Sequence, residues 1–387
     1  MGSPRDALGV VVCVVGARPN YMKMAPLLQA FRKQPALPRP LLVHTGQHYD
    51  PMMNDRLFED LQLPRPDINL EVGSASHAVQ TAETMRRFEP VLDEFRPVCV
   101  IVVGDINSTL ACSLVAAKKG VPVAHVEAGL RSFDRSMPEE INRVLTDQLA
   151  SVLYTTERSA HANLAREGIA AERIEFAGNV MIDSLRAHRE RAVAPEATLR
   201  RARALTSFRG AQGRFGVVTL HRPSNVDTPD ALARCLDILS EAAQKVPLVC
   251  ALHPRTTANV ASFGLGGKLL SDRLLVLPPQ GYLEMLGLMS AATVVLTDSG
   301  GMQEETTALG VPCLTMRENT ERPITVEQGT NTLVGRDRDR ILDLIDEILA
   351  TGGKRGRTPE LWDGRAAERI AAHLARWIAD HPLPARA

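Results

Sequence analysis

The stretch VVLTDSGGMQEETTALGVPCLTM, from Val294 to Met316, shows most clearly the pattern from which the fold is predicted. Two apolar runs typical of strands flank the sequence Asp-Ser-Gly-Gly and a short helical segment that contains Glu304 and Glu305. A strand, a helix and a second strand in succession are typical of a parallel sheet wound with helices. The stretch also raises a chemical question, because it places two glycines and two carboxylates at one strand-to-helix corner.

The same alternation runs along the whole chain of 387 residues. Helical patterns separate short apolar runs, which are GVVVCVVG, PLLVHTG, VCVIVVGD and VPVAHVE in the first half and FGVVTLH, PLVCALH, RLLVLPP, TVVLTDSG and VPCLTM in the second. Strands buried on both faces have this composition, so we predict an α/β protein with two Rossmann-like, doubly wound parallel-sheet domains. We expect the domains to cover residues 1–180 and 181–364, joined near a charged helical stretch from Asn179 to Leu205.

The composition argues against several classes of partner. The 45 basic and 45 acidic residues cancel and are spread along the chain, so we expect no nucleic-acid and no membrane partner. The six cysteines are widely separated, which indicates buried free thiols in a reducing cytosol and no metal site. The run from Ala7 to Ala17 has some signal-peptide character, but it leads straight into a helical pattern, as a buried first strand would. We therefore expect a cytoplasmic protein.

Polar residues stand where the predicted strands end. In chain order these residues are Arg18, Gln47, His48, Asp105, Glu127, His221, His253 and Ser299. Ligands of doubly wound folds bind at the carboxyl edge of the sheet. Two facing carboxyl edges would make one cleft between the domains.

The corner in the opening stretch has the features of a phosphate site. Gly300 and Gly301 would let the backbone approach a ligand closely, and the following helix offers unpaired N–H groups. A diphosphate fits there, and Glu305, one turn further on, could accept hydrogen bonds from ribose hydroxyls. The alternative is a plain tight turn whose glutamates are favoured by the helix dipole.

Two further stretches carry charged residues with alternative explanations. In GARPNYMKMAP, Arg18 and Lys23 could neutralise phosphate or be ordinary surface cations, and the absence of GxGxxG argues against NAD. In MPEEINRVLTDQL, Glu139 could serve catalysis or pair with Arg143 four residues on. The helix in that stretch is expected to bury an apolar stripe formed by Ile141, Val144, Leu145 and Leu149.

Glu127 and His221 stand at predicted strand ends. A free carboxylate at the position of Glu127 would be costly without a purpose, because charged groups lose solvation where strands are buried. His221 could act as a hydrogen-bond donor, an acid or a base near neutral pH, or it could be structural.

A series of motifs in this order resembles the non-hydrolysing UDP-N-acetylglucosamine 2-epimerases. The resemblance runs from about Gly9 to Gly335 through GARPNYMKMAPL, TGQHYD, VVGDINSTLA, HVEAGLRS, MPEEINRVLTD, GNVMIDSL, TLHRPSNV, LHPRT, GYLEML, LTDSGGMQEE and MRENTERPITVEQGTNTLVG. It implies a glycosyltransferase-B-like fold in which the C-terminal helix, about residues 365–387, packs back on the first domain. It also implies a homodimer that binds UDP-GlcNAc, UDP-ManNAc and UDP and needs no cofactor.

The resemblance further implies roles for individual residues. Ser299, Gly300 and Arg18 would hold the diphosphate, and Glu305 would hold the ribose. Other substrate-binding candidates are Gly301, His253 and Arg322, and the family residues linked to catalysis match Lys23, Asp105, Glu127, Glu139 and His221.

The implied reaction explains why several acids are needed. The hydrogen on C2 is hardly acidic, but departure of UDP from C1 makes it removable and leaves a bound 2-acetamidoglucal. Carboxylates would then remove and return the proton, and cations and amides would stabilise the leaving diphosphate.

The chain departs from the best-known branch of this family at several positions. Asn20 stands where that branch has Glu, Tyr49 where it has Arg, and Pro223 and Ser224 where it has Arg-Glu. Substrate bound beside the active site through several of these residues activates that branch, so we expect no strong substrate activation here.

Several functions remain open alongside UDP-GlcNAc 2-epimerisation for surface polysaccharide. They are a hydrolysing 2-epimerase, an epimerase of a related 2-acetamido sugar nucleotide, a glycosyltransferase on the same fold and a non-catalytic sugar-nucleotide sensor.

Overall fold

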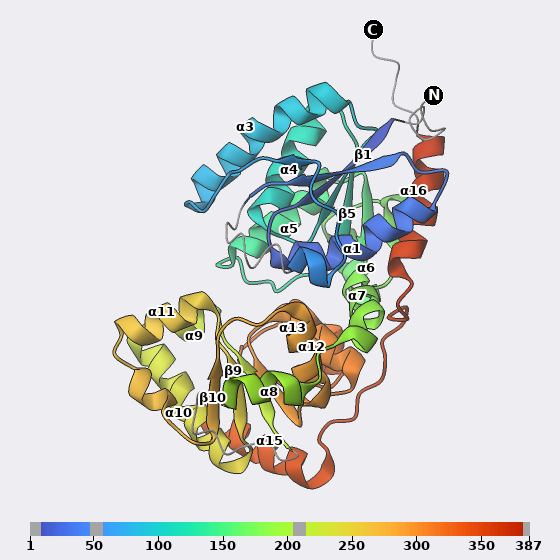
Figure 1. Cartoon of the computed structure of the whole chain (residues 1–387). Coiled ribbons are helices and arrows are strands. Elements are labelled where there is room, and N and C mark those ends of the chain that lie inside the picture. Colours follow the sequence, from blue (N-terminus) through green and yellow to red (C-terminus); the bar gives the residue numbers. More distant parts are fainter. Residues whose placement is uncertain (1–8, 47–56, 204–213, 382–387) are drawn as a thin grey trace. The chain divides into compact units, whose positions relative to one another are not determined.

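The computed structural model describes residues 9–46, 57–203 and 214–381. The predictions made for Gln47, His48 and Tyr49 therefore lie outside the described residues. The chain forms two compact units, one made of Met1–Ala187 with Glu360–Ala387 and the other of His188–Pro359. Each unit is an α/β layered structure built on its own parallel sheet (Figure 1).

The first unit contains a seven-stranded parallel sheet in the order β3-β2-β1-β4-β5-β6-β7. Its strands are β1 (Val10–Val15), β2 (Arg39–His44), β3 (Ile68–Asn69), β4 (Cys99–Val103), β5 (Val123–Ala128), β6 (Val152–Thr155) and β7 (Ile174–Phe176). Its helices are α1 (Arg18–Lys33), α3 (His77–Phe95), α4 (Asn107–Lys118), α5 (Pro138–Leu149), α6 (Arg158–Arg166), η2 (Ala171–Arg173) and α16 (Ala366–Asp380), and α7 (Val180–His188) ends at the start of the second unit.

The second unit contains a six-stranded parallel sheet in the order β10-β9-β8-β11-β12-β13. Its strands are β8 (Gly216–Thr219), β9 (Leu248–Ala251), β10 (Leu274–Leu277), β11 (Val294–Thr297), β12 (Cys313–Thr315) and β13 (Asn331–Leu333). Its helices are η3 (Arg189–Arg191), α8 (Pro195–Arg203), α9 (Pro223–Val226), α10 (Pro229–Lys245), α11 (Pro254–Ser262), η4 (Gly266–Leu269), α12 (Tyr282–Ala291), α13 (Gly300–Leu309), α14 (Pro323–Glu327) and α15 (Arg338–Thr351).

Helices cover both faces of the second sheet. One core joins the strands to α10 and α15, and another joins them to α8, α12 and α13. Strands buried on both faces must be apolar throughout, which is why the sequence runs identified them. The predicted fold class of two doubly wound parallel sheets is confirmed.

The strands that sequence analysis did not identify are β3, β6, β7 and β13. Each has only two to four residues, and β7 is half-buried along its length. β3, β7 and β13 each include at least one polar residue, so they lack the continuous apolar run that identified the other short strands.

The C-terminal helix α16 packs beside α1 in the first unit (Figure 1). Asp183 on α7 accepts hydrogen bonds from the backbone N–H groups of Ala366 and Ala367, at 3.1 and 2.7 Å. These are first-turn amides that have no partner within the helix, so Asp183 stabilises the start of α16. Ile370 and Leu374 are fully buried on its inner face.

The prediction that α5 buries its apolar stripe is wrong. Ile141 and Leu145 are 39% and 46% exposed, whereas the buried residues of the helix are Glu140, Asn142, Arg143, Thr146 and Asp147. The inner face is polar because its side chains hydrogen-bond to loops of the first unit, including Ser132 with Glu140. Hydrophobic periodicity identified the helix correctly but assigned the wrong face to the core.

All six cysteines are buried, and none forms a disulfide, as expected from the sequence. Within the described ranges, no helix combines the length and the apolar composition that crossing a bilayer requires.

Candidate functional site

The first unit gathers candidate residues at the carboxyl ends of three neighbouring strands, β1, β4 and β5. Arg18 is the first residue of α1, which follows β1. Asp105 follows β4, and Glu127 is the second-last residue of β5. The sheet order thus brings together three residues that are far apart in the sequence.

Lys23 and Glu127 form a buried ion pair. The Lys23 Nζ lies 2.6 Å from Glu127 Oε1, and the two side chains are only 5% and 2% exposed. Glu127 has a positive φ of 73°, where the pairing of β5 with β6 shifts register. A bulge of this kind redirects a side chain, so local backbone strain aims the carboxylate at the lysine.

Gly104, at the end of β4, makes room for this pair. Its φ is +66°, and a Cβ at this position would lie 2.9 Å from the Lys23 Nζ. A side chain there would push against the ammonium group, so the turn between β4 and Asp105 requires glycine.

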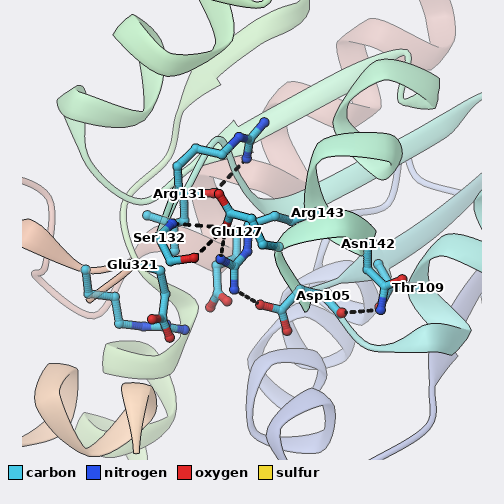
Figure 2. A network of polar contacts seen from close by, with 12 residues as sticks. Asp105, Thr109, Glu127, Arg131, Ser132, Asn142, Arg143 and Glu321 are labelled. Atoms are coloured by element: carbon cyan, nitrogen blue, oxygen red, sulfur yellow. Dashed lines mark hydrogen bonds and ion pairs between the residues drawn. The ribbon is translucent and has the colours of Figure 1, made fainter. Parts of the chain in front are cut away.

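Asp105 is held by α5. The Arg143 guanidinium forms an ion pair with Asp105 Oδ2, and Asn142 Nδ2 donates a hydrogen bond to the Asp105 carbonyl at 2.9 Å (Figure 2). Arg143 also binds Glu140 at 2.5 Å. The polar inner face of α5 therefore positions the Asp105 turn.

The two adjacent glutamates of α5 differ in their surroundings. Glu140 is 2% exposed and accepts hydrogen bonds from the backbone N–H groups of Ser132 and Phe133, at 3.0 and 2.9 Å. Glu139 is half-buried in the first turn of α5. Arg143 contacts Glu140, three residues before it.

Asn20 connects two strand ends. Its Oδ1 accepts hydrogen bonds from the N–H groups of Gly16 and Ala17, at 3.3 and 3.2 Å, and its Nδ2 donates to the Val103 carbonyl at 3.0 Å. The residue is 2% exposed. This position requires a side chain with both a donor and an acceptor atom, and an ionised glutamate has no donor.

In the second unit, His221 is held by Asp298 at the carboxyl ends of β8 and β11. His221 Nδ1 lies 2.8 Å from Asp298 Oδ1. The same carboxylate accepts hydrogen bonds from the backbone N–H groups of His221 and Arg222 and from Asn225 Nδ2, at 2.9 to 3.1 Å. Burial raises the pKa of Asp298, but His221 and these donors outweigh it and hold the pKa below the usual value.

This geometry determines which ring nitrogen of His221 can react. Asp298 fixes Nδ1 as a hydrogen-bond donor, so Nε2 is the nitrogen left to donate or accept a proton. His253 lies beside it, with a ring-centroid distance of 5.8 Å. His253 is the N-cap of α11, where its Nδ1 accepts a hydrogen bond from the Arg255 N–H at 3.2 Å.

The corner of the opening stretch contains a buried arginine. Ser299 is the N-cap of α13, and Gly300 and Gly301 are its first residues. A Cβ on Gly300 would lie 2.6 Å from Arg322 Nη1, so this glycine makes room for a guanidinium at the helix start. Arg322 forms ion pairs with Glu304 and Glu321, at 2.9 and 2.6 Å.

Glu305 lies apart from those ion pairs. It is 4% exposed, and burial raises its pKa to about 7, although the nearby Tyr282 hydroxyl acts in the opposite direction. The two carboxylates that were adjacent in the sequence therefore differ: Glu304 pairs with Arg322, and Glu305 titrates near neutral pH.

Sequence reasoning missed Asp298 and Arg143. Asp298 directly precedes Ser299 at the end of a buried strand, and that position alone could have identified it. Arg143 gave no comparable signal, because its partner Asp105 is 38 residues away in the sequence.

Comparisons with known proteins identify the family of the chain. A family model described as UDP-N-acetylglucosamine 2-epimerase matches residues 30–375. The UDP-N-acetylglucosamine 2-epimerase of Methanocaldococcus jannaschii is 40% identical over 93% of this chain and 97% of its own length. The UDP-2,3-diacetamido-2,3-dideoxy-D-glucuronate 2-epimerase of Pseudomonas aeruginosa is 40% identical over 95% of this chain and 99% of its own.

A crystal structure of the M. jannaschii enzyme in complex with UDP-GlcNAc and UDP superposes with a TM-score of 0.87 at 38% identity and covers 95% of this chain and 99% of that one. The fold is thus glycosyltransferase-B-like, with two Rossmann-like units. The chain belongs to the UDP-N-acetylglucosamine 2-epimerase family.

The hydrogen bonds of Asp298 lead to a test of the His221 loop. Asp298→Ala should destabilise the protein by about 3 kcal/mol, because it leaves buried backbone donors without their acceptor. Urea unfolding followed by circular dichroism measures the change. As a control, Asp237→Ala removes a 55% exposed partner of Lys268 and should change stability by less than about 1 kcal/mol. Equal stability of the two variants would contradict the role given to Asp298.

Proposed function

We propose that the protein interconverts UDP-GlcNAc and UDP-ManNAc by elimination and re-addition of UDP, without net hydrolysis. The observation that supports this best is the cluster of Lys23, Asp105 and Glu127 at one sheet edge, in a chain of the epimerase family. The reaction would supply UDP-ManNAc for surface polysaccharide. The six free cysteines suit a cytoplasmic enzyme.

The proposed reaction has two balanced halves. In the first, the C1–O bond breaks and UDP leaves with its electron pair, a base takes the proton from C2, and the C–H electrons form the double bond of 2-acetamidoglucal. In the second, that double bond takes a proton at C2 from the opposite face, and a UDP oxygen forms a new bond to C1. The electron count is unchanged over the cycle, so no redox cofactor is required.

In this proposal the residues of the two units have different roles in the reaction. Glu127, Asp105 and Glu139 of the first unit carry out the proton transfers at C2, and Lys23 forms an ion pair with the buried Glu127. In the second unit, His221 lies near the leaving diphosphate and can donate from Nε2, because Asp298 holds Nδ1.

UDP itself is assigned to the region around the start of α13. Ser299, Gly300 and Gly301 offer first-turn N–H groups to the diphosphate, and Arg322 adds a positive charge at the same corner. Arg18 and His253 complete the proposed contacts with the diphosphate. Glu305 is assigned to the ribose hydroxyls.

A second candidate substrate has direct support. The P. aeruginosa diacetamido-glucuronate epimerase is as similar to this chain as the M. jannaschii enzyme, at 40% identity each. Incubation with each sugar nucleotide in turn separates the two candidates. Free ManNAc with UDP would instead identify a hydrolysing enzyme, and UDP-GlcNAc binding without turnover would identify a sensor.

The elimination step can be tested in heavy water. Turnover of UDP-GlcNAc in deuterated buffer should place deuterium at C2 of the UDP-ManNAc formed, because the returning proton comes from a group that exchanges with solvent. Proton NMR of the product measures this. Epimerisation without deuterium at C2 would overturn the mechanism.

Glu139→Gln should lower turnover on the order of 100- to 10,000-fold with little change in UDP affinity, as expected for loss of a positioned acid or base. Glu172→Gln, at an exposed glutamate of the same unit, is the matched control and should retain full activity. Full activity in Glu139→Gln would leave Glu139 without a catalytic role.

The raised pKa of Glu305 predicts a pH dependence of UDP binding. Below about pH 7 the buried carboxyl is protonated, and it ionises as the pH rises through that value. A carboxylate accepts ribose O–H bonds better than a neutral carboxyl, so UDP affinity should be higher at pH 8 than at pH 6. Glu305→Gln should lose the part of the pH dependence that comes from this ionisation, and it should bind UDP about 1 to 3 kcal/mol more weakly at pH 8.

Calorimetry at the two pH values measures the effect, and ionisation of UDP itself cancels between wild type and variant. Glu327→Gln, on the exposed side of α14, should behave as wild type. An identical pH dependence in wild type and Glu305→Gln would exclude the ribose role.

We further propose a homodimer that uses the outer face of α5. On this helix Ile141 and Leu145 are 39% and 46% exposed, and Val144 and Leu149 are half-buried; Phe133, in the loop before the helix, is 68% exposed. Exposed apolar side chains grouped on one helix are typical of interaction surfaces. A second copy of the chain supplies an identical apolar face, which is the requirement of a two-fold interface.

Leu145→Asp should convert the dimer to a monomer at micromolar concentration, because it would bury a carboxylate at the centre of the interface. Light scattering gives the mass. Leu270→Asp, at an 84% exposed leucine of the second unit, should leave the dimer intact. A monomeric wild-type protein, or a dimeric Leu145→Asp variant, would contradict this interface.

A further inference from the structure

His125 lies inside the first unit, two residues before Glu127 on β5, and is fully buried. Both of its ring nitrogens are in short polar contacts. Nδ1 lies 2.6 Å from Asp147 Oδ1 on α5, and Nε2 lies 2.7 Å from the carbonyl oxygen of Gly104. The histidine thus links two elements that carry candidate catalytic residues.

The partners of His125 determine its protonation state. A backbone carbonyl cannot donate a hydrogen bond, so Nε2 must carry a proton and donate it to Gly104. The second oxygen of Asp147 accepts hydrogen bonds from the Gly129 N–H at 3.0 Å and from Arg131 Nη2 at 2.7 Å. Asp147 therefore acts as an ionised acceptor on both oxygens, and Nδ1 must carry a proton as well.

The environment of Asp147 supports this assignment. Burial alone would raise the pKa of its carboxyl, but the charges and hydrogen bonds of His125 and Arg131 outweigh burial and lower the pKa. Arg131 is paired in turn with Glu167, at 2.6 Å. The four groups form a chain of alternating charge that is buried except at Glu167, whose side chain is 26% exposed.

We infer that His125 is held as an imidazolium and positions Asp105 and Glu127 for the proton transfers. One N–H fixes the carbonyl of Gly104, the residue directly before Asp105. The inference rests on the proposed function in so far as Asp105 and Glu127 perform those transfers.

The other side of the histidine supports the bulge that carries Glu127. Through Asp147, His125 is connected to the N–H of Gly129, two residues after Glu127. The backbone on both sides of the strained Glu127 is therefore tied to the same imidazolium. A strained backbone persists only where its surroundings hold it in this way.

The charge of the imidazolium also balances the carboxylates around it. The side chains joined by ion pairs in this part of the first unit are Lys23, His125, Arg131 and Arg143 with Asp105, Glu127, Glu140, Asp147 and Glu167. With a charged His125, negative groups outnumber positive groups there by one. With a neutral His125, they would outnumber them by two. Asp105 and Glu127 would then bind protons more readily.

Nitrogen NMR of protein labelled with ¹⁵N-histidine tests the protonation state directly. At pH 7 to 8 both ring nitrogens of His125 should resonate as protonated nitrogens, whereas His161, which bonds only to Thr155 among the contacts described, should resonate as a neutral ring. Asp147→Asn should convert His125 to a neutral ring. One unprotonated nitrogen on His125 in wild type would overturn the inference, whatever reaction the enzyme catalyses.

Kinetics test the positioning role. His125→Gln keeps one donor but loses the charge, and it should lower kcat on the order of 10- to 100-fold while UDP affinity is unchanged, because the misplaced groups act on C2 and not on UDP. The pH–rate profile should shift to higher pH, since Asp105 and Glu127 retain their protons longer. His161→Gln is the matched control and should change neither value.

An unchanged kcat and pH profile in a folded His125→Gln protein would overturn the positioning role. If that variant fails to fold, Asp147→Asn serves in its place, because it removes the partner charge without removing the ring. In Asp147→Asn one negative and one positive group are lost together, so the pH profile should stay in place and kcat is the readout; an unchanged kcat with a neutral His125 would overturn the role equally.

Discussion

The buried contact between the Lys23 ammonium and the Glu127 carboxylate is the interaction on which the first unit depends. At 2.6 Å and almost without solvent, each charge would be very costly without the other. The contact requires a turn at the end of β4 that has no side chain, which is Gly104, and a bulge in β5 that turns Glu127 toward α1. Local backbone features at two strand ends therefore follow from one pair of charges.

The need to pair buried polar and charged groups also explains why α5 turns its polar face inward and its apolar face outward. The loops at the carboxyl edge of the sheet present donors and acceptors that need partners inside the protein, and α5 supplies Glu140, Arg143 and Asp147. A helix that places its charged side chains inward must place Ile141 and Leu145 outward. The exposed apolar face is thus a consequence of the polar network beneath it.

The sequence was sufficient to predict structural features that depend on local composition. It was insufficient to predict features that depend on partners distant in the chain. The β1, β4 and β11 strands are buried on both faces, so their apolar runs identified them, and their order placed Asp105 and Ser299 at strand ends. The inner face of α5 could not be predicted, because a hydrophobic pattern cannot indicate which face is buried when the helix packs through hydrogen bonds. His125 was missed because its importance lies in contacts with Gly104 and Asp147, which are 21 and 22 residues away in the chain.

The opening question about the corner after β11 has a physical answer in the second unit. Glu304 and Glu305 are both almost fully buried, and two adjacent buried carboxylates cannot both be stable ions without compensation. Glu304 is compensated by Arg322, for which Gly300 leaves space, whereas Glu305 forms no ion pair with the residues that the structure describes, and burial raises its pKa to about 7. One carboxylate thus holds a cation at the start of α13, and the other has the raised pKa on which the proposed pH dependence of UDP binding rests.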